Sequence, residues 1–231
     1  MPATARDIVL PKLRSFPLFS ELGPEELETM ATMVTLTSYD RGAVICERES
    51  HGEAMYLLIS GRVKVSLIAS DGREIALSYL DAPSHFGEMA LVDSEPRSAD
   101  VVAVSDCEVI ALDAKDLASA IRVQPKLALS LIATLSRRLR QTIARLEEMA
   151  FCDAKHRVMR VIFNVASASS EGSNSSLVKG LTQYEIGTLA GTSRETASRI
   201  ISQLQKDGVL ETHGRSMTVD LAAMREAMGH Q

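Results

Sequence analysis

The sequence lacks long apolar runs. Its first residues, MPATARDIVLPKLRSF, contain no apolar segment as long as that of a signal peptide. No later stretch approaches the roughly 18 consecutive apolar residues that a membrane-spanning helix needs. Both absences predict a soluble, cytoplasmic protein that has no membrane partner.

Cysteine and histidine are also sparse. Cys46, Cys107 and Cys152 are far apart, odd in number and outside any CxxC pattern, which argues against a disulfide framework and a zinc site. The five histidines are dispersed, and an isolated histidine is more often a hydrogen-bonded structural residue than a metal ligand. We therefore predict that the protein binds no metal.

Recognisable catalytic motifs are missing too. Asp, Glu, His and Ser are plentiful, but the chain contains neither GxSxG nor HExxH. Without a nucleophile or metal motif, no set of residues fills the roles that a catalytic site requires. We expect a protein that is not an enzyme.

Charge is unevenly spread along the 231 residues, which suffice for one large or two modest domains. The net charge is −5, yet residues 1–150 contain 16 Lys and Arg against 22 Asp and Glu, whereas residues 151–231 contain 9 against 8. The C-terminal third therefore lacks the negative charge that would repel DNA.

Short strands dominate the middle of the N-terminal region. A short helix near the start is followed by a second helix, for which Pro24 suits the first helical position. From Val34 to Leu112, the runs AMYLLIS, RVKVSLIA, REIALSYL and VVAVSDCEVIAL are typical of strands, and turn signals such as YDRG, SGR and SDGRE separate them. This pattern predicts a compact antiparallel roll or barrel.

A long helix is predicted after Pro125 and up to Ala150. Its apolar stripe either packs against the roll or forms a coiled-coil seam with a second copy of the chain, and we favour the seam because charged residues flank the stripe. A homodimer follows from that interpretation. The stripe consists of Leu131, Leu135, Leu139, Thr142, Leu146 and Met149.

The sequence FCD, residues 151–153, is expected to be a hinge into a further helix, which the polar loop SSEGSNSS follows. We therefore predict an α+β protein in three parts. Residues 1–124 form the roll with its N-terminal helices, residues 125–152 form the dimerisation helix and hinge, and residues 153–231 form a DNA-binding domain.

A helix-turn-helix is predicted in GLTQYEIGTLAGTSRETASRIISQLQKDGVL. Thr182 and Glu185 fit a capping box at the start of one helix. GTS then breaks that helix, and Ser193 can cap a second one that Gly208 ends. Two short helices joined by a turn of small residues are the pattern of this motif.

The outward positions of the second helix suit DNA recognition, because residues near the start of a recognition helix reach base edges in the major groove. Arginine can bind guanine O6 and N7, and glutamate can accept from cytosine N4. The alternative is a solvated face with pairs such as Glu195 with Arg199. The tight turn and the neutral charge balance favour DNA. The candidate residues are Arg194, Glu195, Ser198, Arg199 and Ser202.

The segment VLETHGRSMTVD is predicted to be a small hairpin with Gly214 at its tip. Such a wing would bring Arg215 near a DNA phosphate. The C-terminal domain is therefore expected to be a winged helix-turn-helix.

The sequence TSRETASRI resembles the recognition element of the cyclic AMP receptor protein and fumarate-nitrate regulator superfamily, and the resemblance extends over essentially the whole chain. It implies that Arg194, Glu195 and Arg199 read bases in a TGTGA-like palindrome of double-stranded DNA. It also implies DNA contacts for Thr182, Gln183, Ser193 and Ser198, and a contact with RNA polymerase for which the SSEGSNSS loop is a candidate.

The segment FGEMALVDSEPRSA resembles the phosphate-binding cassette of that superfamily. The resemblance implies that Arg97 and Ser98 bind a cyclic phosphate, that Glu88 accepts from a ribose hydroxyl, and that Gly87 and Met89 belong to the site. The alternative is an internal Arg97–Glu88 ion pair without a ligand. The iron–sulfur branch of the superfamily is disfavoured, because no cysteine precedes Cys46.

The resemblance places two residues of the long helix against the nucleotide base. Thr142 matches the hydroxyl residue that the family has there, whereas Ile143 replaces a second hydroxyl and offers only apolar contact. Cyclic AMP is therefore the first choice as effector, and cyclic GMP, another nucleotide or ligand-independent DNA binding stay open.

Overall fold

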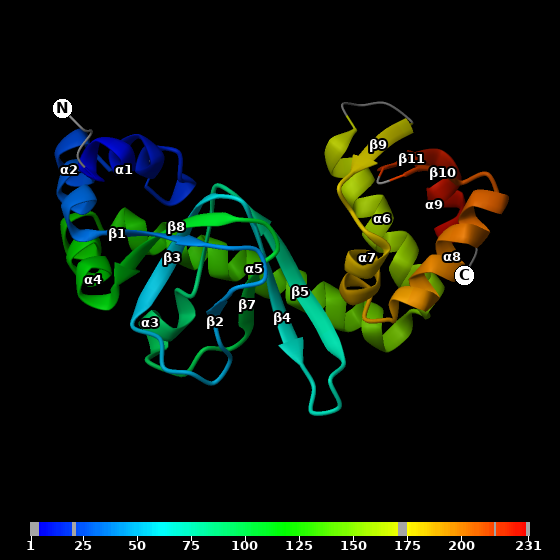
Figure 1. Ribbon diagram of the computed structural model, residues 1–231, viewed down its shortest axis with the longest axis horizontal. Coiled ribbons are helices and arrows are strands. Elements are labelled where there is room, and N and C mark those ends of the chain that lie inside the picture. Colours follow the sequence, from blue (N-terminus) through cyan, green and yellow to red (C-terminus); the bar gives the residue numbers. More distant parts are fainter. Residues whose placement is uncertain (1–4, 20–21, 171–174, 215, 230–231) are drawn as a thin grey trace. The chain divides into compact units, whose positions relative to one another are not determined.

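The computed structural model describes residues 5–19, 22–170, 175–214 and 216–229. These residues form two compact units, and the long helix α5 (Lys126–Phe151) contributes to both. The first unit comprises residues up to 67 together with 77–141, and the second comprises 68–76 together with the residues from 142 onward. The predicted α+β class, with a roll, a long helix and a winged helix-turn-helix, is confirmed (Figure 1). None of the described helices is long and apolar enough to cross a membrane.

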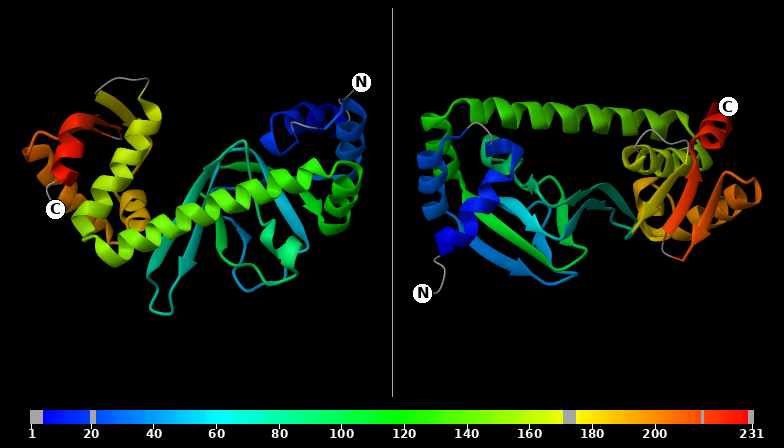
Figure 2. Two further views of the ribbon diagram at one scale, coloured as in Figure 1. Left: turned by 180° about the vertical axis from the view of Figure 1, so that it is seen from behind. Right: turned by 90° about the horizontal axis from the view of Figure 1, so that it is seen from above.

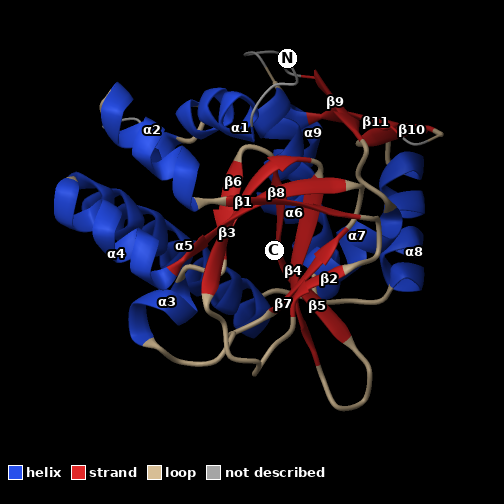
Figure 3. Ribbon diagram, turned by 60° about the vertical axis from the view of Figure 1, so that its left-hand side comes forward, coloured by secondary structure: helices blue, strands red, loops and turns tan. Residues whose placement is uncertain are grey.

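The roll consists of two four-stranded sheets, drawn in red in Figure 3, and the strand pairs β1–β8, β8–β3, β3–β6, β2–β7 and β7–β4 are antiparallel. The first sheet has the order β1 (Thr35–Tyr39), β8 (Cys107–Asp113), β3 (Ala54–Ser60), β6 (Ser84–Phe86). The second has the order β2 (Val44–Cys46), β7 (Asp100–Ala103), β4 (Arg62–Ile68), β5 (Glu74–Asp81).

Strand β3 is buried on both faces, which explains its nearly continuous apolar sequence. Met55 and Leu57 pack with the helices of the first unit, whereas Leu58 belongs to the core between the two sheets, where it meets Val63 and Val101. Successive side chains of a strand point to opposite faces, so both faces need apolar residues here.

Helices cover the outer face of the first sheet. Pro24 is the first residue of its helix, as predicted. The helix after β8 was not predicted; Asp113 caps it by accepting from the backbone N–H groups of Lys115 and Asp116, each at 2.9 Å. These elements are α1 (Ala5–Arg14), the 3₁₀ turn η1 (Pro17–Phe19), α2 (Pro24–Met33), the short α3 (Met89–Asp93), also not predicted, and α4 (Ala114–Val123).

Helix α5, one uninterrupted helix in Figure 2, corrects the predicted apolar stripe. Leu131 is only 3% exposed and packs into the core of the first unit, whereas Leu139 and Leu146 are 61% and 67% exposed. The predicted single seam from Leu131 to Met149 is therefore wrong. A helix has 3.6 residues per turn, so successive steps of four move around its surface, from the face on the roll to an exposed face.

A second stripe occupies the exposed face of α5. Its members follow one another at spacings of 3, 7, 4 and 3, which is the a/d pattern of a coiled coil. They are Leu129, Ile132, Leu139, Ile143 and Leu146, each at least 49% exposed.

The second unit is a helical domain with a three-stranded sheet of order β10–β11–β9. The predicted break between two helices at residues 151–153 is confirmed, and its role as a hinge stays a prediction. Helix α5 ends at Phe151, and Asp153 caps the next helix by accepting from the N–H of His156 at 2.7 Å. Strand β9 and the last helix were not predicted, and Ser175 and Ser176 of the expected polar loop belong to β9. The elements are α6 (Ala154–Ser169), β9 (Ser175–Lys179), α7 (Gln183–Leu189), α8 (Arg194–Lys206), β10 (Leu210–His213), β11 (Ser216–Asp220) and α9 (Leu221–Gly229).

Candidate functional sites

Arg97 is buried in the first unit, with 6% of its surface exposed, and its guanidinium is held by main-chain carbonyls. Nη1 donates to Gly87 O at 2.6 Å and Nη2 donates to Ala54 O at 2.5 Å. The guanidinium carbon also lies 5.7 Å from the centre of the Tyr56 ring, within cation–π range. No carboxylate of the described residues forms an ion pair with Arg97, so its charge is solvated by dipoles and a ring alone.

Glu88 has a different partner from the one that the ligand-free alternative requires. Its side chain is 1% exposed, and Oε1 accepts from Arg138 Nη1 of α5 at 2.5 Å. Arg138 Nη2 donates to the carbonyl of His85, also at 2.5 Å. The internal Arg97–Glu88 ion pair is therefore wrong. Arg138 was predicted only as a charge beside the stripe, and no sequence signal tied it to Glu88.

The second oxygen of this carboxylate is unused. Glu88 Oε2 is buried and has no hydrogen-bond partner within the described parts of the chain. A buried carboxylate oxygen without a donor costs free energy, about 1–3 kcal/mol or more for a charged group. Glu88 thus offers an acceptor to any hydroxyl that reaches it.

Of the other predicted cassette residues, Gly87 contacts Arg97 directly, and Ser98 contacts Met89. Gly87 has a φ of +80°, in the left-handed region that favours glycine, and a Cβ there would lie 2.6 Å from Arg97 Nη1. Met89 opens α3, and the Ser98 hydroxyl donates to its sulfur at 3.8 Å. Ser98 is exposed, so its hydroxyl can reach a ligand.

Two further buried titratable groups stay uncharged at neutral pH. Burial raises the pKa of the Cys46 thiol to about 11, although the positive charge of Arg97 opposes the shift. Burial lowers the pKa of His85 to about 4, against the attraction of Glu88. Neither Cys46 nor His85 therefore adds a charge to this region at neutral pH.

Thr142 and Ile143 are exposed residues of α5, with Ile143 49% exposed. Thr142 is one helical turn beyond Arg138 on the same helix. Ile143 belongs to the exposed apolar stripe, and Thr142 is its neighbour. Of the two residues predicted to meet a base, Ile143 thus lies in the exposed stripe and Thr142 lies next to it.

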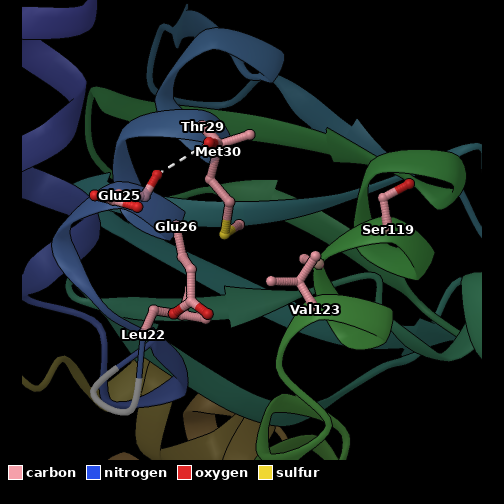
Figure 4. A pocket seen from close by; sticks show the side chains of 8 residues that line it. Leu22, Glu25, Glu26, Thr29, Met30, Ser119 and Val123 are labelled. Carbon is pink, nitrogen blue, oxygen red and sulfur yellow. Dashed lines mark hydrogen bonds between the residues drawn. The ribbon is translucent and has the colours of Figure 1, made fainter.

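A hollow of about 240 Å³ opens elsewhere in the first unit, between α2 and α4 (Figure 4). Its floor is apolar, with Leu22, Met30 and Val123, and none of the predicted ligand residues lines it. Glu26 at its edge already accepts from the N–H of Gly23 at 2.6 Å. This hollow is not the predicted nucleotide site.

The helix-turn-helix of the second unit is built by local caps, as predicted. Thr182 Oγ1 accepts from the N–H of Glu185 at 3.2 Å, and the Glu185 carboxylate accepts from the N–H of Thr182 at 2.7 Å. Ser193 Oγ accepts from the N–H of Thr196 at 3.1 Å. A Cβ on Gly187 would approach Ser193 O to 3.1 Å, so glycine lets the two helices meet closely.

The recognition face of α8 is open. Arg194, Glu195 and Arg199 are exposed, whereas Ala197 and Ile201 are buried in the core of the unit. No ion pair joins Glu195 to Arg199, both of which the structure describes, so the pairing that the alternative of a solvated face named is absent. Hydrogen bonds from its own N–H and from Ser193 lower the pKa of Glu195, which keeps it an ionised acceptor.

The remaining predicted DNA contacts surround α8. Thr182 and Gln183 are exposed at the start of α7, Ser193 is exposed, and Ser198 is half-buried. The hairpin β10–β11 has Gly214 at its turn, with a φ of +63°. Arg215 lies outside the described residues.

Two parts of the chain match known families. Residues 36–124 match the family model described as a cyclic nucleotide-binding domain. Residues 156–227 match the one described as a Crp-like helix-turn-helix domain.

Similar proteins cover nearly the whole chain. The cyclic AMP receptor protein of Thermus thermophilus is 34% identical over 93% of this chain and 97% of its own length. A CRP-like cAMP-activated global transcriptional regulator of Mycobacterium tuberculosis is 28% identical over 87% of this chain and 91% of its own.

Solved structures agree in fold. The catabolite activator protein of Thermus thermophilus aligns with a TM-score of 0.54 and 33% identity, over 93% of this chain and 99% of its own. The c-di-GMP responsive regulator CLP of Xanthomonas campestris has a TM-score of 0.73 and 23% identity, over 85% and 99%.

The buried, neutral His85 predicts a pH-dependent stability. The unfolded chain binds a proton at His85 below about pH 6.5, whereas the folded chain does so only near pH 4. The free energy of unfolding contributed by this site is therefore lost as pH falls from about 6.5 to 4, by up to about 3 kcal/mol. Urea unfolding at several pH values measures this loss of the free energy of unfolding. His85→Leu should make the free energy of unfolding depend less steeply on pH between about 6.5 and 4. Equal slopes for wild type and His85→Leu would contradict the assignment.

Proposed function

Because the chain belongs to the cyclic AMP receptor protein and fumarate-nitrate regulator superfamily, we propose that it is a homodimeric transcription regulator whose binding to a TGTGA-like palindrome is controlled by cyclic AMP. Its cyclic-nucleotide-binding and Crp-like helix-turn-helix domains make it a DNA-binding regulator of that family. Beyond this, we propose the identity of the nucleotide, the DNA sequence, the homodimer and a cytoplasmic location.

The observation that carries nucleotide control is the buried, unpaired charge of Arg97. A guanidinium has five N–H donors, and two donate to Gly87 O and Ala54 O, which leaves three for a ligand. A cyclic phosphate supplies the negative charge and the acceptor oxygens that this group lacks. Ser98 adds a hydroxyl at the same place.

Glu88 is the residue that we propose binds the ribose beside that phosphate. Its unused Oε2 is an acceptor for a ribose 2′-hydroxyl, while Oε1 keeps its bond to Arg138. A bound nucleotide would then contact α5 through Glu88 and Arg138. Since a ligand shifts a conformational equilibrium only through its different affinity for the two states, this link is where occupancy could bias α5.

We propose the identity of the base from the chemistry of Thr142 and Ile143. Thr142 can hydrogen-bond an adenine, and Ile143 offers apolar contact only. Cyclic AMP is accordingly the effector we propose, and cyclic GMP is its nearest competitor. The relative from Mycobacterium tuberculosis is described as cAMP-activated, which supports the choice.

The dimer is proposed from the exposed stripe of α5. Large apolar side chains at a/d spacing on a solvent-exposed helix face are costly unless another helix covers them. A two-fold dimer through α5 would present two copies of α8, and a palindrome with half-sites roughly 34 Å apart would match them.

DNA reading is proposed for the exposed residues at the start of α8, with Thr182, Gln183, Ser193 and Ser198 around them. Arg194 and Arg199 can bind guanine edges and Glu195 can accept from cytosine. RNA polymerase is the further partner that the family implies. Of the loop predicted to contact it, residues 171–174 lie outside the described residues.

A ligand-independent DNA-binding regulator is the alternative, because Arg97 is already hydrogen-bonded to two carbonyls without a nucleotide. Calorimetric titration of the full chain with cyclic AMP and cyclic GMP decides between the two. Heat of binding with either nucleotide supports the proposal, and none with both supports the alternative.

Replacing Arg97 by Leu should weaken cyclic AMP binding by at least about tenfold, because a charge-assisted phosphate contact is lost. Calorimetry on the full chain measures the change. Arg122→Leu, an exposed arginine of α4, is the matched control and should bind as wild type does. Unchanged binding by Arg97→Leu would remove Arg97 from the site.

Shortening Leu139 to Ala should weaken self-association by about tenfold or more, since a leucine at a seam buries apolar surface in both copies. Sedimentation equilibrium measures the dimer constant. Gln141→Ala, exposed but off the stripe, is the control. If both variants associate equally well, α5 does not form the seam that we propose.

Arg194→Ala should relax the preference for one guanine of the half-site by about 1–3 kcal/mol. Arg215→Ala should weaken all sequences alike and make the salt dependence shallower. Fluorescence anisotropy with the TGTGA palindrome and single-base variants, at two salt concentrations, separates the effects. The same sequence profile for both variants would argue against base reading by Arg194.

A further inference from the structure

We propose that Gly52 is a positioning residue for the nucleotide site: it has no side chain so that the guanidinium of Arg97 can occupy the space in front of it. A Cβ built on Gly52 would lie 2.2 Å from both Cζ and Nε of Arg97, and 2.6 Å from Nη2. The sequence marks Gly52 only as part of the turn signal ESHGE, and it lies in the loop between β2 and β3.

The loop that carries Gly52 has little freedom to move away. The N–H of Arg97 donates to Ser50 O, and the N–H of Glu49 donates to Arg97 O, both at 2.9 Å. On the other side of Gly52, the N–H of Ala114 donates to Glu53 O at 3.1 Å. The main chain on each side of Gly52 is therefore hydrogen-bonded to neighbouring segments.

Arg97 is the partner that would have to move. Its guanidinium is the end of a long side chain with several rotatable bonds, whereas the facing loop is fixed by main-chain hydrogen bonds. A methyl group at position 52 would displace the guanidinium from Gly87 O and Ala54 O. The three N–H groups left for a phosphate would lose their orientation with it.

Gly52 and Gly87 face the same guanidinium, yet only Gly52 allows a clean test. Gly87 has a positive φ, so any side chain there also strains the backbone. The backbone of Gly52 lies outside the left-handed region, so alanine is compatible with its conformation. The effect of Gly52→Ala is thus the steric effect on Arg97.

The inference rests on the proposed function, because its readout is cyclic AMP binding by the full chain. Gly52→Ala should lower the affinity for cyclic AMP by at least about tenfold, as loss of an oriented charge-assisted contact does. Its melting temperature should fall below that of wild type, because the displaced guanidinium loses the hydrogen bonds to Gly87 O and Ala54 O that offset its burial. Gly23→Ala, whose Cβ would have only an ordinary contact at 3.5 Å with Glu26, is the matched control.

A double-mutant cycle identifies Arg97 as the residue through which Gly52 acts. In the Arg97→Leu background, Gly52→Ala should change neither cyclic AMP affinity nor melting temperature. An equal loss of affinity in both backgrounds, or wild-type affinity for Gly52→Ala alone, overturns the inference.

If Gly52→Ala unfolds, the melting temperature of the double variant decides: recovery to that of Arg97→Leu supports the steric account, and no recovery overturns it. If wild type itself binds no cyclic nucleotide, the proposed function fails; the melting temperatures of the same cycle then test the contact between Gly52 and Arg97 by themselves.

Discussion

The arrangement of the first unit around its candidate site depends on the burial of one positive charge, the guanidinium of Arg97. Burying an ion without a counter-ion is costly unless dipoles replace the lost water. At Arg97 the carbonyls of Gly87 and Ala54 and the ring of Tyr56 do so. Three features of the main chain fit this arrangement. Gly87 has a left-handed backbone, Gly52 has no side chain, and the β2–β3 loop is hydrogen-bonded to the main chain of Arg97. The result is a preorganised cation whose remaining donors suit an anion.

A second charged group connects that site to α5. Glu88 is held by Arg138, and Arg138 is also anchored to the carbonyl of His85. The neutral His85 beside them adds no competing positive charge at neutral pH. Arg138, and one turn later Thr142, belong to the same helix as the exposed apolar stripe. One helix thus carries the partner of Glu88, a candidate base contact and the proposed dimer surface.

Much of the fold and of the candidate sites could be predicted from local sequence patterns. The predictions that were wrong or missing share one physical cause. Short apolar runs bounded by turn signals predicted the strands of the roll, cap signals predicted the two helices of the recognition motif, and TSRETASRI indicated the family. The helix stripe was misassigned because Leu131 and Leu139 look alike in sequence, although one packs on the roll and the other is exposed. The bond of Arg138 to Glu88, 50 residues away, and the closeness of Gly52 to Arg97 depend on tertiary packing, which periodicity does not encode.

Our central proposal is that nucleotide binding in the roll controls DNA binding by α8. Its most direct test is the affinity of the full chain for a TGTGA palindrome with and without cyclic AMP, at about 0.15 M salt because phosphate contacts make affinity salt-dependent. We predict that cyclic AMP raises this affinity by at least about tenfold, and leaves the affinity for a scrambled duplex nearly unchanged. The same affinity for the palindrome with and without the nucleotide would contradict the account.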